Sequence, residues 1–412
     1  MPRVGMVGGG QLARMTHQAA IALGQTLAVL ATSPDDSAAL VSPDVRLGSH
    51  LDLEALRAFA ARCDVVTFDH EHVPAEHLRA LAADGHAVFP GADALQYAQD
   101  KALMRGRLAE LGAPVPRFAV LDGAEELVEA ATAFGFPLVV KTARGGYDGR
   151  GVWVISQAQA LPSLAEQLAG AGRLVLEELV TMRRELAAVV ARSPFGQAAA
   201  WPVVETVQQD GICVQVVAPA AGLAERRAAA ATELALRIAG ELGVVGVLAV
   251  ELFEVQTSER FPDGLAVNEL AMRPHNSGHW TMDGSITSQF EQHLRAVLDY
   301  PLGRTDPVAA FTVMGNVLGG PADGPGAGLG IDERVHHLAA RFPQVKVHLY
   351  GKSYRPGRKL GHVNVLGDDV VELQRVATLA ADFLGDGVWA DGFDPHGGRP
   401  MQRPGQTEGR SR

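Results

Sequence analysis

The segment at residues 141–151 constrains this chain most. Its sequence is KTARGGYDGRG, a lysine followed by a run rich in glycine, and apolar stretches at residues 136–140 and 152–155 flank it. A Walker loop places its lysine after the glycines and continues into a helix. Here the lysine comes first and a strand follows, so we predict a β-hairpin whose turn closes over phosphates through backbone N–H groups. Lys141 would contact the α- and β-phosphates of a nucleotide.

Two glutamates lie in the apolar middle of consecutive predicted strands. The strands are expected at residues 246–255 and 265–272, and they carry Glu251 and Glu269. A carboxylate in such a position is costly unless it is paired with a cation or bound to a metal. Two of them facing each other across a hairpin form a hard-oxygen site that suits Mg²⁺. Two structural acids held in salt bridges are the alternative.

The second of these strands continues into a dense polar segment. Residues 268–280 have the sequence NELAMRPHNSGHW. Because side chains alternate along an extended segment, Glu269, Arg273 and His275 should point to one side. Residues 276–279 add hydrogen-bond donors in a turn, and packing alone does not explain so many polar groups.

The N-terminus has the pattern of a doubly wound α/β domain. We expect a strand at residues 3–7, a tight turn at residues 8–11 (GGGQ), a helix at residues 12–23 and a second strand at residues 26–31. The glycines of the turn, with an acidic pair about 20 residues on, satisfy a dinucleotide-binding pattern. The same turn suits any phosphate or carboxylate at a helix N-terminus, so both uses stay open.

Residues 69–72, with the sequence DHEH, follow an expected buried strand at residues 65–68. We predict an ordinary loop at the carboxyl end of that strand. A zinc pair formed by His70 and His72 is the alternative.

Two further segments could contact a nucleotide. We predict one long amphipathic helix at residues 94–111, in which Lys101 either reaches a phosphate or is simply solvated. The apolar strand at residues 174–180 turns acidic at Glu177 and Glu178. Such a strand, leading into a connecting segment, could hold adenine and ribose, whereas surface carboxylates at a strand end are the alternative.

A basic run follows an expected strand near the C-terminus. Residues 351–362 have the sequence GKSYRPGRKLGH. Basic residues gathered in an acidic protein suggest an anion site, with a solvated basic turn as the alternative. A last helix is expected at residues 370–383, and residues 393–412 are polar and rich in Gly, Pro and Arg, which favours disorder.

Composition limits the class of protein. The formal charge is −11, which argues against a nucleic-acid-binding face but not against a small anionic substrate. Cys63 and Cys213 are far apart and form no CxxC pattern, so we expect thiols in a reducing compartment. No apolar run reaches about 18 residues and the chain enters a strand at once, so we expect a cytoplasmic protein without a membrane span or signal peptide. Its 412 residues suggest two or three domains.

Four motifs together resemble those of the N5-carboxyaminoimidazole ribonucleotide synthases, an ATP-grasp family of bacterial purine synthesis. They are GGGQL from residue 8, GGYDGRG from residue 145, NELAMRPHNSGHWT from residue 268 and RPGRKLGH from residue 355. The resemblance implies an α/β and α+β architecture of three lobes and a tail. These are a doubly wound pre-ATP-grasp domain at 1–93, a two-part ATP-grasp domain at 94–305 with its flap subdomain at about 115–182, a small β-rich domain at 306–392 and a disordered tail at 393–412.

The family reaction implied by this resemblance joins bicarbonate to aminoimidazole ribonucleotide through carboxyphosphate. It consumes ATP and yields N5-carboxyaminoimidazole ribonucleotide, ADP and phosphate, and the family is usually a homodimer. Mg²⁺ would be held by Glu251 and Glu269. The chemistry would fall to Lys141, Arg273, His275 and Asp148, and either of the last two would take the proton of the amine.

The resemblance also implies the residues that bind the two larger substrates. ATP would contact Lys101, Lys141, Gly146, Tyr147, Asp148, Gly149, Arg150, Gly151, Glu177, Glu178, Leu179, Val180, Glu185, Gln208, Asn268 and Glu269. The ribonucleotide and bicarbonate would contact Gly10, Gln11, Tyr147, Arg150, Arg273, His275, Asn276, Ser277, Lys352, Arg355 and Arg358.

Three rival functions stay open at this point. A sister ATP-grasp ligase would join formate to glycinamide ribonucleotide, although the HNSGHWT and RPGRK stretches speak against it. A nicotinamide-dependent oxidoreductase would use the glycine turn at residues 8–11 but leaves the paired glutamates unexplained. A nucleotide sensor would bind ATP without turnover.

Overall fold

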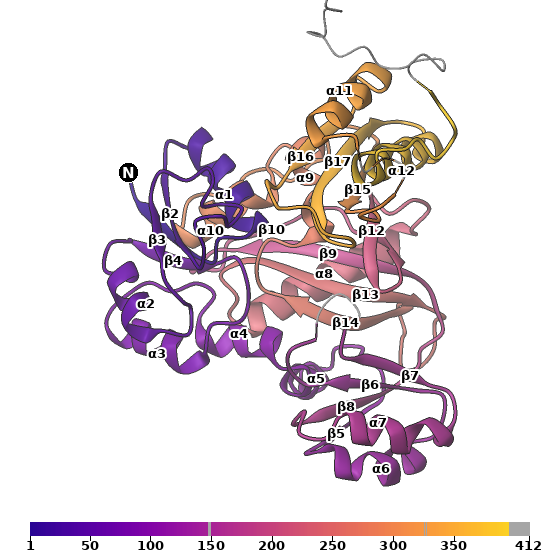
Figure 1. The fold of residues 1–412 in the computed structure, drawn as a ribbon. Coiled ribbons are helices and arrows are strands. Elements are labelled where there is room, and N and C mark those ends of the chain that lie inside the picture. The colour runs from indigo at the N-terminus through magenta and orange to yellow at the C-terminus, as the bar shows by residue number, and fades with distance from the viewer. Residues whose placement is uncertain (147–149, 325, 327, 395–412) are drawn as a thin grey trace, which may run out of the picture.

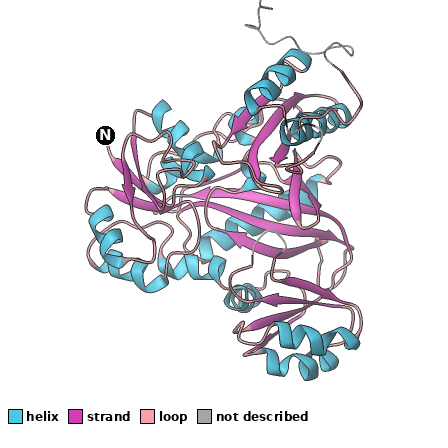
Figure 2. Cartoon of the chain, viewed as in Figure 1, coloured by secondary structure: helices cyan, strands magenta, loops and turns pink. Residues whose placement is uncertain are grey.

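The computed structural model describes residues 1–146, 150–324, 326 and 328–394. The predicted site residues Tyr147, Asp148 and Gly149, and residues 395–412 of the predicted tail, lie outside the described residues. The strands of the described part belong to three sheets (Figures 1 and 2). No helix in this part of the chain has the length and apolar character needed to cross a membrane.

The start of the chain forms the expected parallel α/β domain. Its elements are β1 (Arg3–Val7), α1 (Gln11–Ala22), β2 (Thr26–Ala31), β3 (Val45–Leu47), α2 (Leu53–Ala60), β4 (Val65–Phe68) and α3 (Ala75–Ala83). The sheet order is β3-β2-β1-β4, and its pairs are parallel. One face packs against α1 and against α10 (Gln289–Val297), a helix from much later in the chain, whereas α2 and α3 cover the other face.

The single helix predicted at residues 94–111 is wrong, because the structure breaks it at Asp100. Helix α4 (Ala92–Gln99) ends there and α5 (Lys101–Glu110) begins. Asp100 has an extended backbone, and its Oδ1 accepts hydrogen bonds from the N–H groups of Ala102 and Leu103. This is an N-cap, which a helix pattern alone does not reveal when it falls inside a continuous amphipathic run.

The segment around the glycine-rich turn forms its own small sheet. Its strands are β5 (Phe118–Leu121), β6 (Leu138–Thr142), β7 (Val152–Ile155) and β8 (Leu174–Glu178), and its helical elements are η1 (Ala124–Glu126), α6 (Leu127–Phe134), η2 (Ala158–Ala160) and α7 (Leu161–Gln167). The order is β5-β8-β6-β7, with β6 and β7 antiparallel. The predicted hairpin on either side of the glycine-rich turn is therefore confirmed.

The largest sheet runs through the middle of the molecule (Figure 2). The strands of the core are β9 (Met182–Arg192), β10 (Ala198–Ala200), β11 (Val204–Gln209), β12 (Ile212–Ala218), β13 (Gly246–Val255) and β14 (Leu265–Ala271). Helix α8 (Glu225–Glu241) packs against β9 and β13. Strands β13 and β14 pair antiparallel with a bulge near Glu251, so the hairpin predicted to carry both glutamates is confirmed.

The C-terminal strands extend this same sheet instead of forming a separate one. The remaining elements are η3 (Asn276–Gly278), α9 (Thr281–Gly284), β15 (Phe311–Leu318), α11 (Ile331–Arg341), β16 (Lys346–Leu349), β17 (Lys359–Gly367) and α12 (Val370–Asp386). Strand order in the sheet is β14-β13-β9-β11-β12-β15-β17-β16, and β10 pairs with β9. The basic run therefore lies in the connection between β16 and β17 and in the first residues of β17.

His293 on α10 joins the first domain to the core. Its Nδ1 accepts a hydrogen bond from the Val247 N–H at 3.2 Å, so its proton sits on Nε2, 2.7 Å from Thr67 Oγ1. A side chain at position 246 would collide with the ring, since a Cβ on Gly246 would lie 2.8 Å from His293 Cε1. Burial lowers the pKa of His293 to about 4, so the ring is neutral.

This buried imidazole should make the protein sensitive to acid. The unfolded chain takes up a proton at His293 near pH 6.5 and the folded protein only near pH 4, so the stability contributed by the neutral ring is complete above pH 6.5 and is lost as the pH falls. The full effect is about 3 kcal/mol. His293→Gln should lower the urea midpoint at pH 7. Between pH 7 and pH 5, the midpoint of this variant should fall by less than the midpoint of the wild type. His336→Gln, at an exposed position on α11, is the control, and an equal decline in all three proteins would contradict the assignment.

Candidate active site

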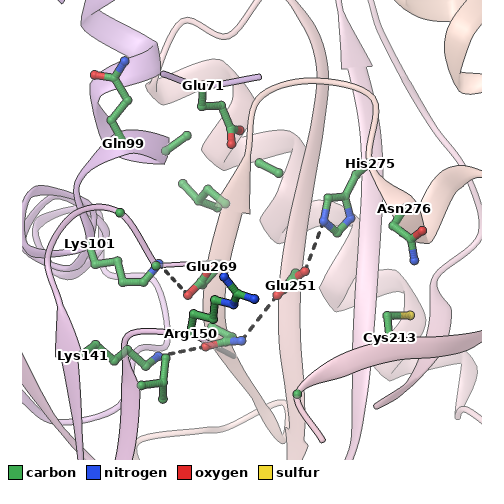
Figure 3. A pocket seen from close by; sticks show the side chains of 18 of the residues that line it. Glu71, Gln99, Lys101, Lys141, Arg150, Cys213, Glu251, Glu269, His275 and Asn276 are labelled. Atoms are coloured by element: carbon green, nitrogen blue, oxygen red, sulfur yellow. Dashed lines mark hydrogen bonds and ion pairs between the residues drawn. The ribbon is translucent and has the colours of Figure 1, made fainter. Parts of the chain in front are cut away.

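A single cleft of about 1230 Å³ collects most of the residues that the sequence singled out. The first domain, the small sheet, the core and the start of β17 all line it. Most ligand pockets are about 300–1,000 Å³, so this cleft has room for two substrates side by side. Figure 3 shows part of its wall, where acidic and basic side chains point toward one another.

Two lysines from different elements meet the acidic strand β14. Lys101, in the first turn of α5, places its Nζ 2.8 Å from Glu269 Oε1. Lys141, at the end of β6, places its Nζ 3.1 Å from Asn268 Oδ1 and 3.0 Å from Glu177 Oε2. The break at Asp100 matters here, because Lys101 reaches the cleft only from a helix that begins at this point. Arg150 points into the same space (Figure 3).

Glu177 is part of the cleft wall but almost fully buried, with 3% of the residue exposed. Its two carboxylate oxygens contact Arg105 at 2.7 and 3.1 Å, and one of them also contacts Lys141. Burial alone would raise the pKa of Glu177, but the charges of Arg105 and Lys141 lower it to about 2. Both oxygens are thus already engaged by cations. Through this contact Glu177 positions Lys141.

Glu251 and Glu269 stand across the β13–β14 hairpin with about a third of each side chain open to the cleft. Loss of bulk water raises the pKa of Glu251 to about 7, and the negative charge of Glu269 adds to the effect. Loss of water would also raise the pKa of Glu269, but Lys101 and Lys141 lower it instead. Near pH 7 the pair therefore has one ionised member, Glu269, and one member, Glu251, that is about half protonated. This donor set suits a hard cation, which would favour ionisation of both carboxylates.

The two glutamates do not form a complete metal cage by themselves. Among the described residues, no three His, Cys, Asp or Glu side chains are grouped to hold a metal ion. Mg²⁺ typically binds one or two carboxylates and completes its shell with water and substrate phosphates, so two glutamates fit this ion.

His275 lies beside Glu251 and is rigidly placed. Its Nε2 is 3.3 Å from Glu251 Oε1, and its Nδ1 is 2.9 Å from Ser277 Oγ. Gln289 holds the backbone on both sides, since its Oε1 accepts from the His275 N–H and its Nε2 donates to the His275 carbonyl, each at 2.8 Å. Burial, with help from Arg273, lowers the pKa of His275 to about 3. The ring is therefore neutral and a poor proton acceptor.

Glu71 of the first domain is a cleft residue that the sequence did not single out. Its Oε1 accepts a hydrogen bond from the Met272 N–H at 2.7 Å, and its Oε2 lies 3.3 Å from Arg273 Nε. The nearby His70 and His72 rings stack at 5.3 Å. The available signal was position, because residues at the carboxyl ends of parallel strands are where such domains bind ligands.

The carboxylate of Asp69 lies at the glycine turn of residues 8–11. Asp69 Oδ2 accepts a hydrogen bond from the Ala13 N–H at the start of α1, at 3.3 Å. A Cβ at Gly10 would lie 2.5 Å from that oxygen, so glycine is needed for the approach. A carboxylate at this helix N-terminus takes the place that a dinucleotide pyrophosphate would need. The dinucleotide interpretation of the turn is therefore not favoured.

The basic run is only partly directed at the cleft. Lys352 donates to Gln11 Oε1 at 2.5 Å and so reaches the cleft's edge through a cleft residue. Arg358 instead binds Ser353, and Arg355 is exposed; neither lines the cleft. Lys359 of the same run does line it. The sequence located the segment but not which of its cations turns inward.

Most of the other predicted residues lie where expected. The cleft is lined by Gln11, Lys101, Lys141, Gly146, Arg150, Glu177, Glu178, Leu179, Val180, Glu185, Gln208, Glu251, Asn268, Glu269, Arg273, His275, Asn276 and Ser277. The predicted residues that are described but do not line it are Gly10, Gly151, Lys352, Arg355 and Arg358.

Three protein-family models match successive parts of the chain. A ribonucleotide synthetase preATP-grasp domain matches residues 1–99, an ATP-grasp domain matches residues 106–290, and a phosphoribosylaminoimidazole carboxylase C-terminal domain matches residues 312–376. The three models follow one another in the order of the lobes described above.

Individual proteins of one name are similar over nearly the full chain. An N5-carboxyaminoimidazole ribonucleotide synthase of Mycobacterium bovis is 61% identical over 397 residues, 96% of this chain and 90% of that protein. A crystal structure of the synthetase of that name from Thermus thermophilus is 36% identical with a TM-score of 0.80, covering 93% of this chain and 98% of the other. A synthase from Aspergillus clavatus in complex with ADP and 5-aminoimidazole ribonucleotide is 31% identical with a TM-score of 0.82, covering the same shares.

Proposed function

This chain belongs to the N5-carboxyaminoimidazole ribonucleotide synthase family of ATP-grasp enzymes, and from that premise we propose how its cleft performs the family reaction. It is an ATP-dependent ligase of purine biosynthesis that carboxylates aminoimidazole ribonucleotide. One observation carries the assignment of roles: lysines, paired glutamates and the Arg273–His275 segment, from distant parts of the chain, converge on one cleft.

We assign the nucleotide to the end of the cleft that holds the lysines. Lys101 and Lys141 would contact the phosphates together with Gly146 and Arg150. Both lysine amines already contact side-chain oxygens of β14 at this end of the cleft. The connection after β8 would hold the adenine and ribose. Its residues and their neighbours are Glu178, Leu179, Val180, Glu185 and Gln208.

The metal would be held by Glu251 and Glu269, whose oxygens fit Mg²⁺ by chemistry and by charge. When bound, Mg²⁺ neutralises charge on the phosphates. Asn268 lies beside the pair: its Nδ2 donates to Glu251 Oε2 at 3.5 Å, and its Oδ1 accepts from Lys141 Nζ at 3.1 Å.

The chemistry asks mainly for positioning and charge neutralisation. A bicarbonate oxygen would attack the γ-phosphate, and the exocyclic amine of the ribonucleotide would then capture the carboxyphosphate carbon or the CO₂ released from it. Lys141 and Arg273 would neutralise the developing charge, and Glu71 fixes Arg273 in place. The acceptor of the amine proton would be His275, whose pKa burial lowers to about 3, or Asp148, which lies outside the described residues.

Two finer properties are also proposed. The protein would be a homodimer, as its family resemblance implies, and light scattering should then give about twice the chain mass of 43.4 kDa. It would act in the cytoplasm, and cell fractionation tests this.

The function is tested by measuring ADP release with ATP, bicarbonate and aminoimidazole ribonucleotide, omitting each in turn. Turnover should require all three. Glu269→Gln should lower it at least about a hundredfold, because a carboxylate ligand of the Mg²⁺ that neutralises the phosphates would be lost. Glu259→Gln, at an exposed position in the β13–β14 turn, is the control. Near-normal turnover of Glu269→Gln would refute the metal assignment.

Turnover with formate and glycinamide ribonucleotide instead would identify the sister ligase, and ATP binding without turnover would identify a sensor.

The raised pKa of Glu251 predicts a pH-dependent metal affinity. With a pKa of about 7, only about a tenth of Glu251 is ionised at pH 6 and most is ionised at pH 8, so Mg²⁺ should bind about tenfold more weakly at pH 6. In the metal-free protein, the stability due to protonated Glu251 is lost as the pH rises from about 4.5 to 7. Titration of Mg²⁺ in the presence of ADP measures the effect. Glu251→Gln should remove the difference beyond that of ADP itself, and an unchanged difference would contradict the assignment.

The contact of Lys352 with Gln11 predicts a role in holding the ribonucleotide phosphate. Lys352→Met should raise the KM for aminoimidazole ribonucleotide at least about tenfold, because a charge-assisted hydrogen bond is lost, and should leave the KM for ATP unchanged. Lys346→Met, at an exposed position on β16, is the matched control. Equal changes in both KM values would place Lys352 elsewhere.

A further inference from the structure

Arg105 is a fully buried cation one helical turn after Lys101, and no role has yet been assigned to it. Its side chain is 0% exposed. Its Nε and Nη2 donate to the two oxygens of Glu177, at 2.7 and 3.1 Å, in a bidentate pair. Its Nη1 donates to the Val267 carbonyl on β14 at 3.1 Å. One guanidinium therefore ties α5 to a strand on each side of the nucleotide end of the cleft.

Charge within this cluster is unequal. Glu177 is shared between Arg105 and Lys141, so two cations meet one anion and the group carries one net positive charge. Arg105 occupies both oxygens of Glu177, whereas Lys141 shares only one of them. The carboxylate is thus neutralised from the side of the protein interior, and the unbalanced charge lies on Lys141, at the cleft surface.

Removal of Arg105 would reverse this arrangement. Glu177 is 3% exposed, so it would keep its cost of burial and would have Lys141 as its remaining ion-pair partner in the described cluster. A buried carboxylate without its bidentate partner binds a remaining cation more tightly. Lys141 would then be drawn to Glu177 and away from any anion in the cleft.

We propose that Arg105 is a positioning residue for nucleotide binding, which neutralises Glu177 and thereby leaves the charge of Lys141 available to the phosphates of ATP. The proposal rests on the assignment of Lys141 to ATP made above. It gives Arg105 and Glu177 a joint function: Glu177 aims the lysine, and Arg105 prevents Glu177 from capturing it. A guanidinium suits this task better than an ammonium because it makes all three contacts at once.

Equilibrium binding of Mg²⁺ and the imido analogue of ATP tests the proposal without depending on turnover or on the ribonucleotide. Arg105→Met should weaken binding at least about tenfold, the size expected when one charge-assisted contact is lost. Arg105→Lys, which keeps the charge but not the bidentate fork, should bind more tightly than Arg105→Met and more weakly than the wild type. Arg107→Met is the matched control, because Arg107 lies on the same helix, pairs with Glu110 and is partly exposed.

The double variant Arg105→Met/Glu177→Gln gives the deciding result. With the carboxylate replaced by a neutral amide, Lys141 is no longer captured, so the double variant should bind at least about threefold more tightly than Arg105→Met. A purely structural role would leave the double variant as weak as the single one or weaker. Thermal unfolding of each variant checks folding, and if Arg105→Met does not fold, Arg105→Lys and the double variant still decide. Wild-type binding in Arg105→Met, or a double variant that binds no more tightly than Arg105→Met, would overturn the proposal, whereas loss of ribonucleotide-dependent turnover alone would bear on the proposed function instead.

Discussion

Carboxylates removed from water need cations, and this requirement ties the parts of the molecule together. Lys101 of α5 meets Glu269 of the core, and Arg273 of the core meets Glu71 of the first domain. In each pair the partners come from different parts of the chain. An ion pair of this kind is weak evidence for stability, because desolvation offsets much of the attraction. Its contribution here is to geometry, because each pair brings charged side chains from distant parts of the chain together in the cleft.

No single part of the chain supplies all the charged groups of the cleft. The β13–β14 hairpin alone would hold two carboxylates close together, and burial, with the charge of Glu269 adding to it, raises the pKa of Glu251. Lys101 relieves one of them only because α5 begins at Asp100 and aims its first turn at β14. His293, far from the chemistry, keeps the first domain against the core and so keeps Glu71 in reach of Arg273. Packing and site geometry therefore depend on the same contacts.

Local patterns predicted the parts of the site that are local in the chain. The two hairpins followed from alternation and glycine, and the alternation of residues 269–275 placed arginine and histidine on the cleft side. What was missed depends on tertiary contact. The cap at Asp100 is hidden inside an amphipathic run, and Glu71 and Lys359 become cleft residues only when distant strand ends meet. The family resemblance implied that Arg355 and Arg358 contact the ribonucleotide, but neither lines the cleft. Sequence alone does not tell which side of an irregular turn faces inward.

Glu177 lines the cleft, and both of its carboxylate oxygens are engaged by cations of the protein. Its position at the end of an acidic strand pointed to the nucleotide, and it does lie beside the nucleotide end of the cleft. Its oxygens, however, are held by Arg105 and Lys141, so any effect on ATP passes through a lysine. A cleft that must bind a polyanion cannot also leave its own buried carboxylates unbalanced. On this proposal, the cations that face the protein interior are as much a part of nucleotide binding as the cations that face the cleft.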